Sequence, residues 1–263
     1  MLIHSDVHTF LKEINQAIEN ESFSIDKWLD YLRKLKDKYS QTKEIERFVE
    51  NKAPYRFLQT LNKYSQEDEV FCVDIGQNQM WTAQTLNLKK GQKFYTSGGL
   101  APMGYSLPSS VGVSFADKSK TVYSINGDGG FHMAIQSLML ISQYDLPIKV
   151  IVLNNSSLGM ITQFQDLYFK GRLSGSTPKG GYLVPDIEAL AKAYNIPYYQ
   201  ISEKDLGNED LMQEIFKNKN CIIEYLIKGL TTVSPKLEYN RPIEQVMPLL
   251  SDEEMTESMS IDI

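Results

Sequence analysis

The sequence predicts an α/β fold: a doubly wound, mostly parallel sheet with helices on both faces, preceded by a short helical segment. From residue 54 onward, stretches with helical spacing alternate with short strand-like runs, which is the order expected of parallel strands joined by crossover helices. The strand-like runs are almost continuously apolar, as strands buried on both faces of a sheet should be. Two of these runs end in clusters of glycine, asparagine and aspartate.

The first 53 residues carry helical patterns and no strand-like run. Residues 9–20 and 25–39 each gather apolar side chains on one helical face. Two such helices have little to pack on by themselves. We therefore expect segment 1–53 to dock on the body that follows or to belong to something larger.

The body is predicted to span residues 54–250. We expect helices at 55–64, 102–116, 131–144, 186–194 and 208–217, and strands at 69–75, 121–125, 148–153, 198–201 and 221–227. Pro108 lies inside the second helix and should kink or interrupt it. The glycine-rich stretch 171–182 has no periodicity and is expected to be a mobile loop, either a plain connection or a lid. Residues 251–263 are acidic and lack an apolar face, which predicts a loosely held tail.

Composition excludes several classes of protein. Hydrophobic residues make up 42% of the chain and the formal net charge is −6, which is ordinary for a globular protein. The acidic balance, with no basic cluster, argues against nucleic acid as a partner. No apolar run is long enough for a membrane span and the first residues lack a signal-peptide pattern, so we expect a cytoplasmic protein without a membrane partner. Cys72 and Cys221 each lie in an apolar run, which favours buried thiols over a disulfide.

The candidate functional residues follow two predicted strands. Asp128 lies among glycines in residues 126–130 (NGDGG), and Asn155 follows the next strand directly. Ligands of such sheets bind beyond the carboxyl ends of the strands, so both clusters should face one crevice. Glycines let the backbone approach a phosphate. A lone carboxylate would repel that phosphate unless Asp128 held a divalent cation, for which the amide oxygen of Asn155 is a suitable second ligand.

Each of these signals also has a plainer interpretation. A Gly-Asp-Gly-Gly sequence is commonly a turn, and this one has neither the spacing of a dinucleotide-binding motif nor the carboxylates of an EF-hand loop. Gln77 and Asn78 also fit a simple turn. Met103, Met160 and Phe164 also fit an ordinary apolar core. Three histidines in the whole chain leave little material for a histidine-based metal site or triad.

Taken together, the two clusters resemble the signature of thiamine-diphosphate enzymes. The surrounding residues resemble the large subunit of acetolactate synthase and its close relatives, in segments 74–81 (DIGQNQMW), 97–108 (SGGLAPMGYSLP), 127–133 (GDGGFHM) and 153–165 (LNNSSLGMITQFQ). The resemblance runs from about residue 54 to about residue 248 and covers the pyrophosphate-binding domain of that family. Segment 1–53 resembles, more weakly, the end of the family's central domain and the linker after it. The family's pyrimidine-binding domain has no counterpart here.

The resemblance implies thiamine diphosphate and Mg²⁺ as cofactors and a role for each matching position. Asp128 and Asn155 would bind the metal through their side chains, and Ser157 through its backbone carbonyl. Met103, Met160 and Phe164 would lie at the reacting centre, with Met103 beneath the cofactor and holding it in its bent shape. The implied cofactor-binding residues are Ile75, Gln77, Asn78, Ala101, Met103, Gly127, Asp128, Gly129, Gly130, Asn155, Ser157, Gly159 and Met160.

The activity that the resemblance implies is a transferase reaction, in which pyruvate is decarboxylated and joined to a second 2-oxo acid, as in branched-chain amino-acid biosynthesis. It further implies a homodimer or larger homo-oligomer, with FAD possible in the full-length enzyme. The glutamate that activates the cofactor belongs to the pyrimidine-binding domain of the same or a partner chain. We therefore expect this chain to be inactive alone, either as a fragment or as one subunit of a split enzyme.

Some positions depart from the family pattern. Phe164 stands where acetolactate synthases usually have Trp, Ala101 where they usually have Gly, Gly130 where Ser is common and Ser137 where Glu is usual. These changes leave the predicted metal site intact. They are also compatible with a substrate other than that of acetolactate synthase, namely another 2-oxo acid. The alternatives are therefore another decarboxylase or lyase of the same superfamily, or a non-catalytic scaffold with this fold.

Overall fold

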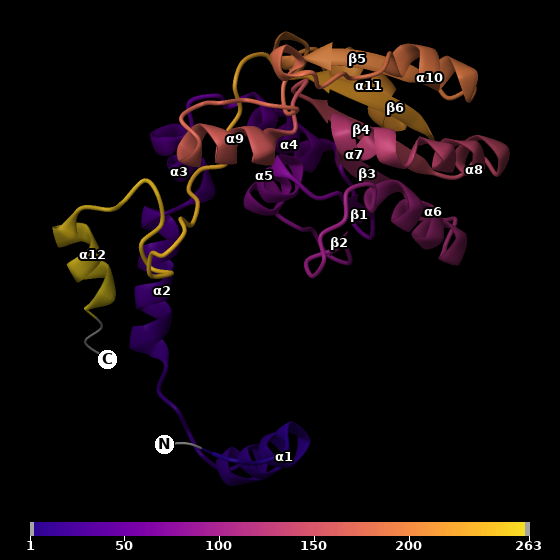
Figure 1. Cartoon of the computed structure of the whole chain (residues 1–263). Coiled ribbons are helices and arrows are strands. Elements are labelled where there is room, and N and C mark those ends of the chain that lie inside the picture. The colour runs from indigo at the N-terminus through magenta and orange to yellow at the C-terminus, as the bar shows by residue number, and fades with distance from the viewer. Residues whose placement is uncertain (1–2, 261–263) are drawn as a thin grey trace. The chain divides into compact units, whose positions relative to one another are not determined.

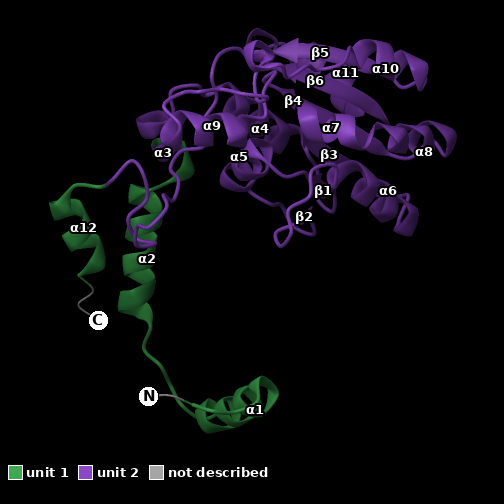
Figure 2. Cartoon of the chain, viewed as in Figure 1, with its two compact units in different colours: residues 1–43, 250–263 green, residues 44–249 purple. Residues whose placement is uncertain are grey.

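The computed structural model describes residues 3–260. Residues 1–2 and 261–263, which include the ends of the predicted helical segment and of the predicted tail, lie outside the described part. The chain divides into two compact units, one formed by residues 1–43 and 250–263 and the other by residues 44–249 (Figure 2). The larger unit contains the sheet.

The sheet has six strands in the order β2-β1-β3-β4-β6-β5 (Figure 1), and every neighbouring pair is parallel. This confirms the predicted doubly wound α/β fold. The strand not predicted is β2, an edge strand with exposed alternate residues, which lacks the continuous apolar run of the central strands. The strands are β1 (Val70–Val73), β2 (Lys93–Thr96), β3 (Val122–Gly127), β4 (Ile148–Asn154), β5 (Tyr198–Ser202) and β6 (Cys221–Leu226).

Helices cover both faces of the sheet. On one face α3 (Gln41–Phe48), α4 (Ala53–Tyr64), α5 (Gln77–Thr85) and α11 (Glu209–Lys217) contribute to a buried apolar cluster. On the other, α6 (Ser106–Ala116), α7 (Asp128–Met133), α8 (Leu138–Gln143) and α10 (Ile187–Ala193) contribute to a second cluster. Phe71 belongs to the first cluster and Cys72 to the second, because successive side chains of a strand point to opposite faces. Side chains on both faces of the central strands are therefore buried in an apolar cluster, which explains the continuous apolar runs in their sequences.

Two predicted helices differ in their bounds. The helix expected at 102–116 begins at Ser106, since Ala101 and Gly104 have left-handed backbones with φ of 51° and 86°. Pro108 therefore lies in the first turn, where its missing N–H costs no helical hydrogen bond, and the helix continues past it. The helix expected at 131–144 is α7, a 3₁₀ turn at Ile135–Ser137, and α8.

Gln77 and Asn78 are the first residues of α5, where the sequence suggested only a turn. The turn after β4 leads into α9 (Gly159–Tyr168). Short 3₁₀ turns lie at Pro178–Gly180 and Glu203–Asp205. Cys72 and Cys221 are both free and buried, as predicted. None of the helices described between residues 3 and 260 combines the length and apolar character that crossing a membrane requires.

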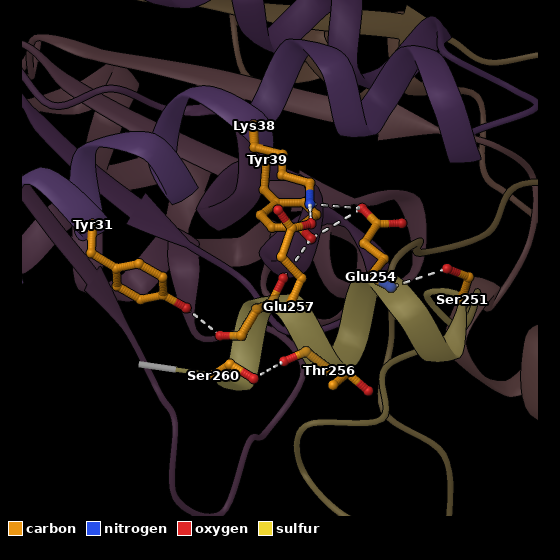
Figure 3. A network of polar contacts seen from close by, with 9 residues as sticks. Tyr31, Lys38, Tyr39, Ser251, Glu254, Thr256, Glu257 and Ser260 are labelled. Carbon is orange, nitrogen blue, oxygen red and sulfur yellow. Dashed lines mark hydrogen bonds and ion pairs between the residues drawn. The ribbon is translucent and has the colours of Figure 1, made fainter. Parts of the chain in front are cut away.

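The smaller unit contains α1 (Val7–Ile18), α2 (Asp26–Lys38) and α12 (Asp252–Met259). The first two match the helices predicted at 9–20 and 25–39. Helix α12 lies in the predicted tail, and the hydroxyl of Ser251 caps it by accepting the N–H of Glu254 at 3.1 Å. Polar contacts join it to α2 and the residue after α2: Tyr39 donates to the Glu254 carboxylate at 3.0 Å, and Tyr31 donates to the Ser258 carbonyl (Figure 3).

Candidate functional site

A cavity of about 410 Å³ opens beyond the carboxyl ends of β1, β3 and β4. Residues after each of these strands, together with Ala101 and Met103, line it. From β1 the chain proceeds to β2 on one side of the sheet, whereas from β3 it proceeds to β4 on the other. The cavity therefore lies at a topological switch point, where open α/β sheets bind ligands.

The cavity gathers every residue that the sequence predicted to bind the cofactor, including the three predicted metal ligands. Met160 lines it and also packs against the first apolar cluster. Phe164 lies outside the lining: its side chain is 43% exposed and its ring packs 4.7 Å from that of Tyr168. The predicted cofactor-binding residues that line the cavity are Ile75, Gln77, Asn78, Ala101, Met103, Gly127, Asp128, Gly129, Gly130, Asn155, Ser157, Gly159 and Met160. Their individual roles stay predictions.

Asp128 is the buried carboxylate of this cavity, with a side chain of which 1% is exposed. Its Oδ1 accepts a hydrogen bond of 2.6 Å from the hydroxyl of Tyr182, whereas its Oδ2 is buried and has no hydrogen-bond partner among the described residues. Burial raises the pKa of Asp128, and the hydrogen bond from Tyr182 opposes that rise. A buried oxygen of this kind is costly unless a donor or a cation satisfies it.

Asn155 and Ser157 belong to the turn after β4. The Oδ1 of Asn155 accepts the N–H of Ser157 at 3.2 Å, and its Nδ2 donates to the hydroxyl of Thr231 at 2.8 Å. The backbone N–H groups of Ser156 and Ser157 lower the pKa of Asp128, so this turn faces the carboxylate. The turn that carries Asn155 and Ser157 thus lies beside Asp128, and all three residues line the same cavity.

The glycines after β3 lie where side chains would not fit. A Cβ at Gly129 would lie 2.8 Å from Leu158 Cδ2 and 2.9 Å from Met103 Cε, and one at Gly130 would lie 2.2 Å from Asp74 Oδ2. Any larger residue would therefore displace neighbouring groups. Gly127, Gly129 and Gly130 all line the cavity, so this part of its wall is main chain without side chains.

Three residues of the site were missed by sequence reasoning. Asp74 is fully buried and accepts N–H groups of Ile75, Gly104 and Tyr105 at 2.7 to 3.3 Å, which braces the segment containing Met103. Thr231 joins Asn155 to Gln77, since its hydroxyl donates to Gln77 Oε1 at 2.6 Å. Tyr182 binds Asp128. A carboxylate at a strand end before glycine could have identified Asp74, but no local pattern marks Thr231 or Tyr182.

Comparison with known proteins identifies the family to which this chain belongs. Residues 74–224 match the family described as "Thiamine pyrophosphate enzyme, C-terminal TPP binding domain". The chain belongs to this family, and the cavity lies at the carboxyl ends of the strands within the matched segment. Thiamine pyrophosphate is the same compound as thiamine diphosphate.

The chain is similar to acetolactate synthases in particular. It is 34% identical over 210 residues to acetolactate synthase 2, chloroplastic, of Zea mays, covering 77% of this chain and 33% of the relative. It is 35% identical over 183 residues to the acetolactate synthase large subunit of Corynebacterium glutamicum (69% and 29%) and 33% identical over 210 residues to that of Lactococcus lactis (80% and 36%). It is thus an acetolactate synthase-like domain, and it spans about a third of the length of these curated relatives.

Proposed function

We propose that this chain is the cofactor-binding part of a thiamine-diphosphate- and magnesium-dependent transferase that decarboxylates one 2-oxo acid, pyruvate, and joins the product to a second. The observation that carries the proposal is the cavity in which all the expected cofactor contacts meet an unpartnered oxygen of Asp128. When bound there, the cofactor would supply the electron sink for decarboxylation.

Asp128 Oδ2, the amide oxygen of Asn155 and the carbonyl of Ser157 would hold Mg²⁺, because this ion takes one or two carboxylates with other oxygens and phosphate. No group of three or more His, Cys, Asp or Glu side chains that could hold a metal occurs within residues 3–260, so the cation would depend on one carboxylate. The main chain of Gly129 and Gly130 would approach the diphosphate. The unpartnered oxygen and the glycine backbone that lines the cavity fit such a group.

The described cavity wall contains no glutamate. We therefore propose that the activating glutamate comes from a pyrimidine-binding domain of the same or a partner chain in a homodimer or larger homo-oligomer. This chain would then be inactive alone. We also propose residues 54–250 as the cofactor-binding domain, after segment 1–53 and before tail 251–263. The setting would be branched-chain amino-acid synthesis in the cytoplasm, and any FAD would bind outside this part.

Calorimetric titration of the full 263-residue chain with Mg²⁺ and thiamine diphosphate tests the proposal. We expect weak binding, since part of the site lies elsewhere, and its loss in Asp128→Ala. The matched control is Asp117→Ala, which removes an exposed carboxylate bonded to Ser119. Binding that persists unchanged in Asp128→Ala would exclude the metal assignment.

A second candidate is another 2-oxo acid decarboxylase or lyase of the superfamily. Phe164 favours it, because its side chain lies outside the cavity wall and offers no contact to a second substrate there. Product analysis with pyruvate, after this chain is combined with its pyrimidine-binding domain, distinguishes the two. Acetolactate supports the first candidate, and release of an aldehyde alone supports the second.

A further inference from the structure

The glycine-rich stretch 171–182 is tied to the site rather than loose. Ser176 is fully buried, and its carbonyl accepts hydrogen bonds from Leu158 N at 2.9 Å, Ser157 Oγ at 3.0 Å and Thr162 Oγ1 at 3.2 Å. Its hydroxyl donates to Gln165 at 2.6 Å. The stretch is thus bonded to the turn after β4 and to α9.

The end of the same stretch is a tight turn that presents Tyr182. Both Gly180 N and Tyr182 N donate to the carbonyl of Thr177, at 2.8 and 2.9 Å. Gly181 has a φ of 97°, and a Cβ at Gly180 would lie 2.8 Å from the carbonyl of Leu173. These positions need glycine, so the turn holds the Tyr182 backbone in one place.

From that place the hydroxyl of Tyr182 reaches one oxygen of Asp128 and leaves the other. The 2.6 Å hydrogen bond is made to Oδ1, while Oδ2 stays buried without a partner among the described residues. Tyr182 is absent from the lining of the cavity, whereas Asp128 is part of it. The hydroxyl lies beside Gly129, where a Cβ would be 3.0 Å from it, so it reaches Asp128 at the edge of the cavity.

From this geometry we infer that Tyr182 is a positioning residue: it holds Asp128 by one oxygen so that the other oxygen is presented to the cation. The inference rests on the proposed function, and it adds a residue that acts on the metal through Asp128. The stretch 171–182 then supports the metal site at two points, at Asp128 through Tyr182 and at Ser157 through Ser176.

The test uses Tyr182→Phe in the full chain, with Mn²⁺ replacing Mg²⁺ and thiamine diphosphate in excess. Free and bound Mn²⁺ are measured by electron paramagnetic resonance. Because hydrogen bonds to charged groups are strong, we expect roughly tenfold weaker Mn²⁺ affinity and a broader spectrum of the bound ion. The matched control is Tyr199→Phe, whose hydroxyl donates to Glu214 on the surface at 2.9 Å, and it should bind Mn²⁺ like the wild type.

Thermal unfolding without ligand accompanies the titration and establishes that each variant is folded at the temperature used. Unchanged Mn²⁺ affinity in a folded Tyr182→Phe, with binding lost in Asp128→Asn, would overturn the inference and leave the proposed function standing. Tighter binding would also overturn it, because the hydroxyl would then compete with the cation. No binding by the wild-type chain would overturn the proposed function and this inference with it.

Discussion

Gly130 has no room for a side chain because Asp74 lies against it. A Cβ there would be 2.2 Å from Asp74 Oδ2, and that carboxylate cannot move away cheaply since backbone N–H groups of Gly104 and Ile75 hold it. We expect Gly130→Ala to lower the free energy of unfolding by about 1–3 kcal/mol, measured by urea titration.

Gly112 provides the control for that substitution. It is exposed in the interior of α6 and a Cβ would meet nothing within 4 Å. Gly112→Ala should therefore stabilise the protein by about 0.5–1 kcal/mol through helix propensity alone. Equal effects of the two substitutions would show that the contact with Asp74 does not limit position 130.

The buried thiols predict a loss of stability at alkaline pH. Burial raises the pKa of Cys221 from 9.0 to about 12. The unfolded chain releases the Cys221 proton near the ordinary thiol pKa, whereas the folded chain retains it to a higher pH. The stability that the buried neutral thiol contributes is therefore complete below about pH 9 and is lost as the pH rises toward about 12. Between about pH 8 and about pH 10, wild type should lose about 1 kcal/mol more than Cys221→Ala. Parallel losses in the two proteins would contradict this.

The same burial predicts slow chemical modification. Cys72 and Cys221 are fully buried, and burial raises the pKa of the Cys72 thiol as well. Because the thiolate is the reactive form, both thiols should resist an aromatic disulfide reagent in the native protein and react at once in denaturant. Rapid labelling of the folded chain would contradict their placement.

Individual site residues differ in how far the sequence could predict them. Asp128 and Asn155 follow apolar strands directly, so local pattern and the rule for parallel sheets were enough to place them in one crevice. Tyr182 reaches Asp128 across 54 positions of the chain, and Thr231 reaches Asn155 across 76. Nothing in their immediate neighbourhood marks these contacts, which depend on how the sheet and its loops pack.

At the scale of elements, α12 depends on its polar contacts with α2 and Tyr39. It buries no residue, and Tyr39 donates to Glu254 at 3.0 Å and lies 3.0 Å from the hydroxyl of Ser258 (Figure 3). Removing the hydroxyl with Tyr39→Phe should cost about 1 kcal/mol. We expect roughly fivefold faster hydrogen exchange of the α12 amides.

Thr256→Ala is the control within the same helix. Its hydroxyl donates only to the carbonyl of Asp252 one turn earlier, at 2.7 Å, so the variant should leave exchange in α12 close to wild type. If Tyr39→Phe exchanges no faster than Thr256→Ala, the contacts between α2 and α12 do not hold the helix in place.

The helices and strands also differ in how far the sequence could predict them. The central strands were predictable because burial on both faces gives them unbroken apolar runs. Strand β2 was not, since it pairs with β1 alone at the edge and half of its side chains are exposed. Helix α5 was not predicted, because its first turn is polar. Gln77 and Asn78 are nonetheless buried, and Gln77 is bonded to the distant residues Gln163 and Thr231.

At the scale of the whole molecule, residues 44–249 should fold without the rest. Both buried apolar clusters and the whole cavity wall lie within this range, whereas α1, α2 and α12 bury no residue. We expect a chain of residues 44–249 to unfold cooperatively, within a few degrees of the full chain, and to bind Mg²⁺ and thiamine diphosphate equally well. Scanning calorimetry and titration measure both properties.

A chain of residues 54–249 is the informative comparison, because the sequence predicted the boundary there. It lacks Ile45 of α3 and Val49 directly after that helix, which are each 5% exposed and belong to the first apolar cluster. Losing them should cost at least about 2 kcal/mol. Equal stability of the two shortened chains would show that α3 is dispensable and would favour the boundary at residue 54.

Most of the residues that line the cavity were predicted only through the resemblance to thiamine-diphosphate enzymes. The sequence pattern by itself determined the α/β class and the end of the sheet that carries the site. These features follow from local periodicity and from the polar residues at strand ends, which any parallel sheet brings to the same edge. Only the tertiary structure decided which oxygen of Asp128 is left without a partner, that Tyr182 holds the other, and that α6 begins at Ser106. Those outcomes depend on contacts between segments far apart in the chain, whose positions are set by packing and not by any pattern within one segment.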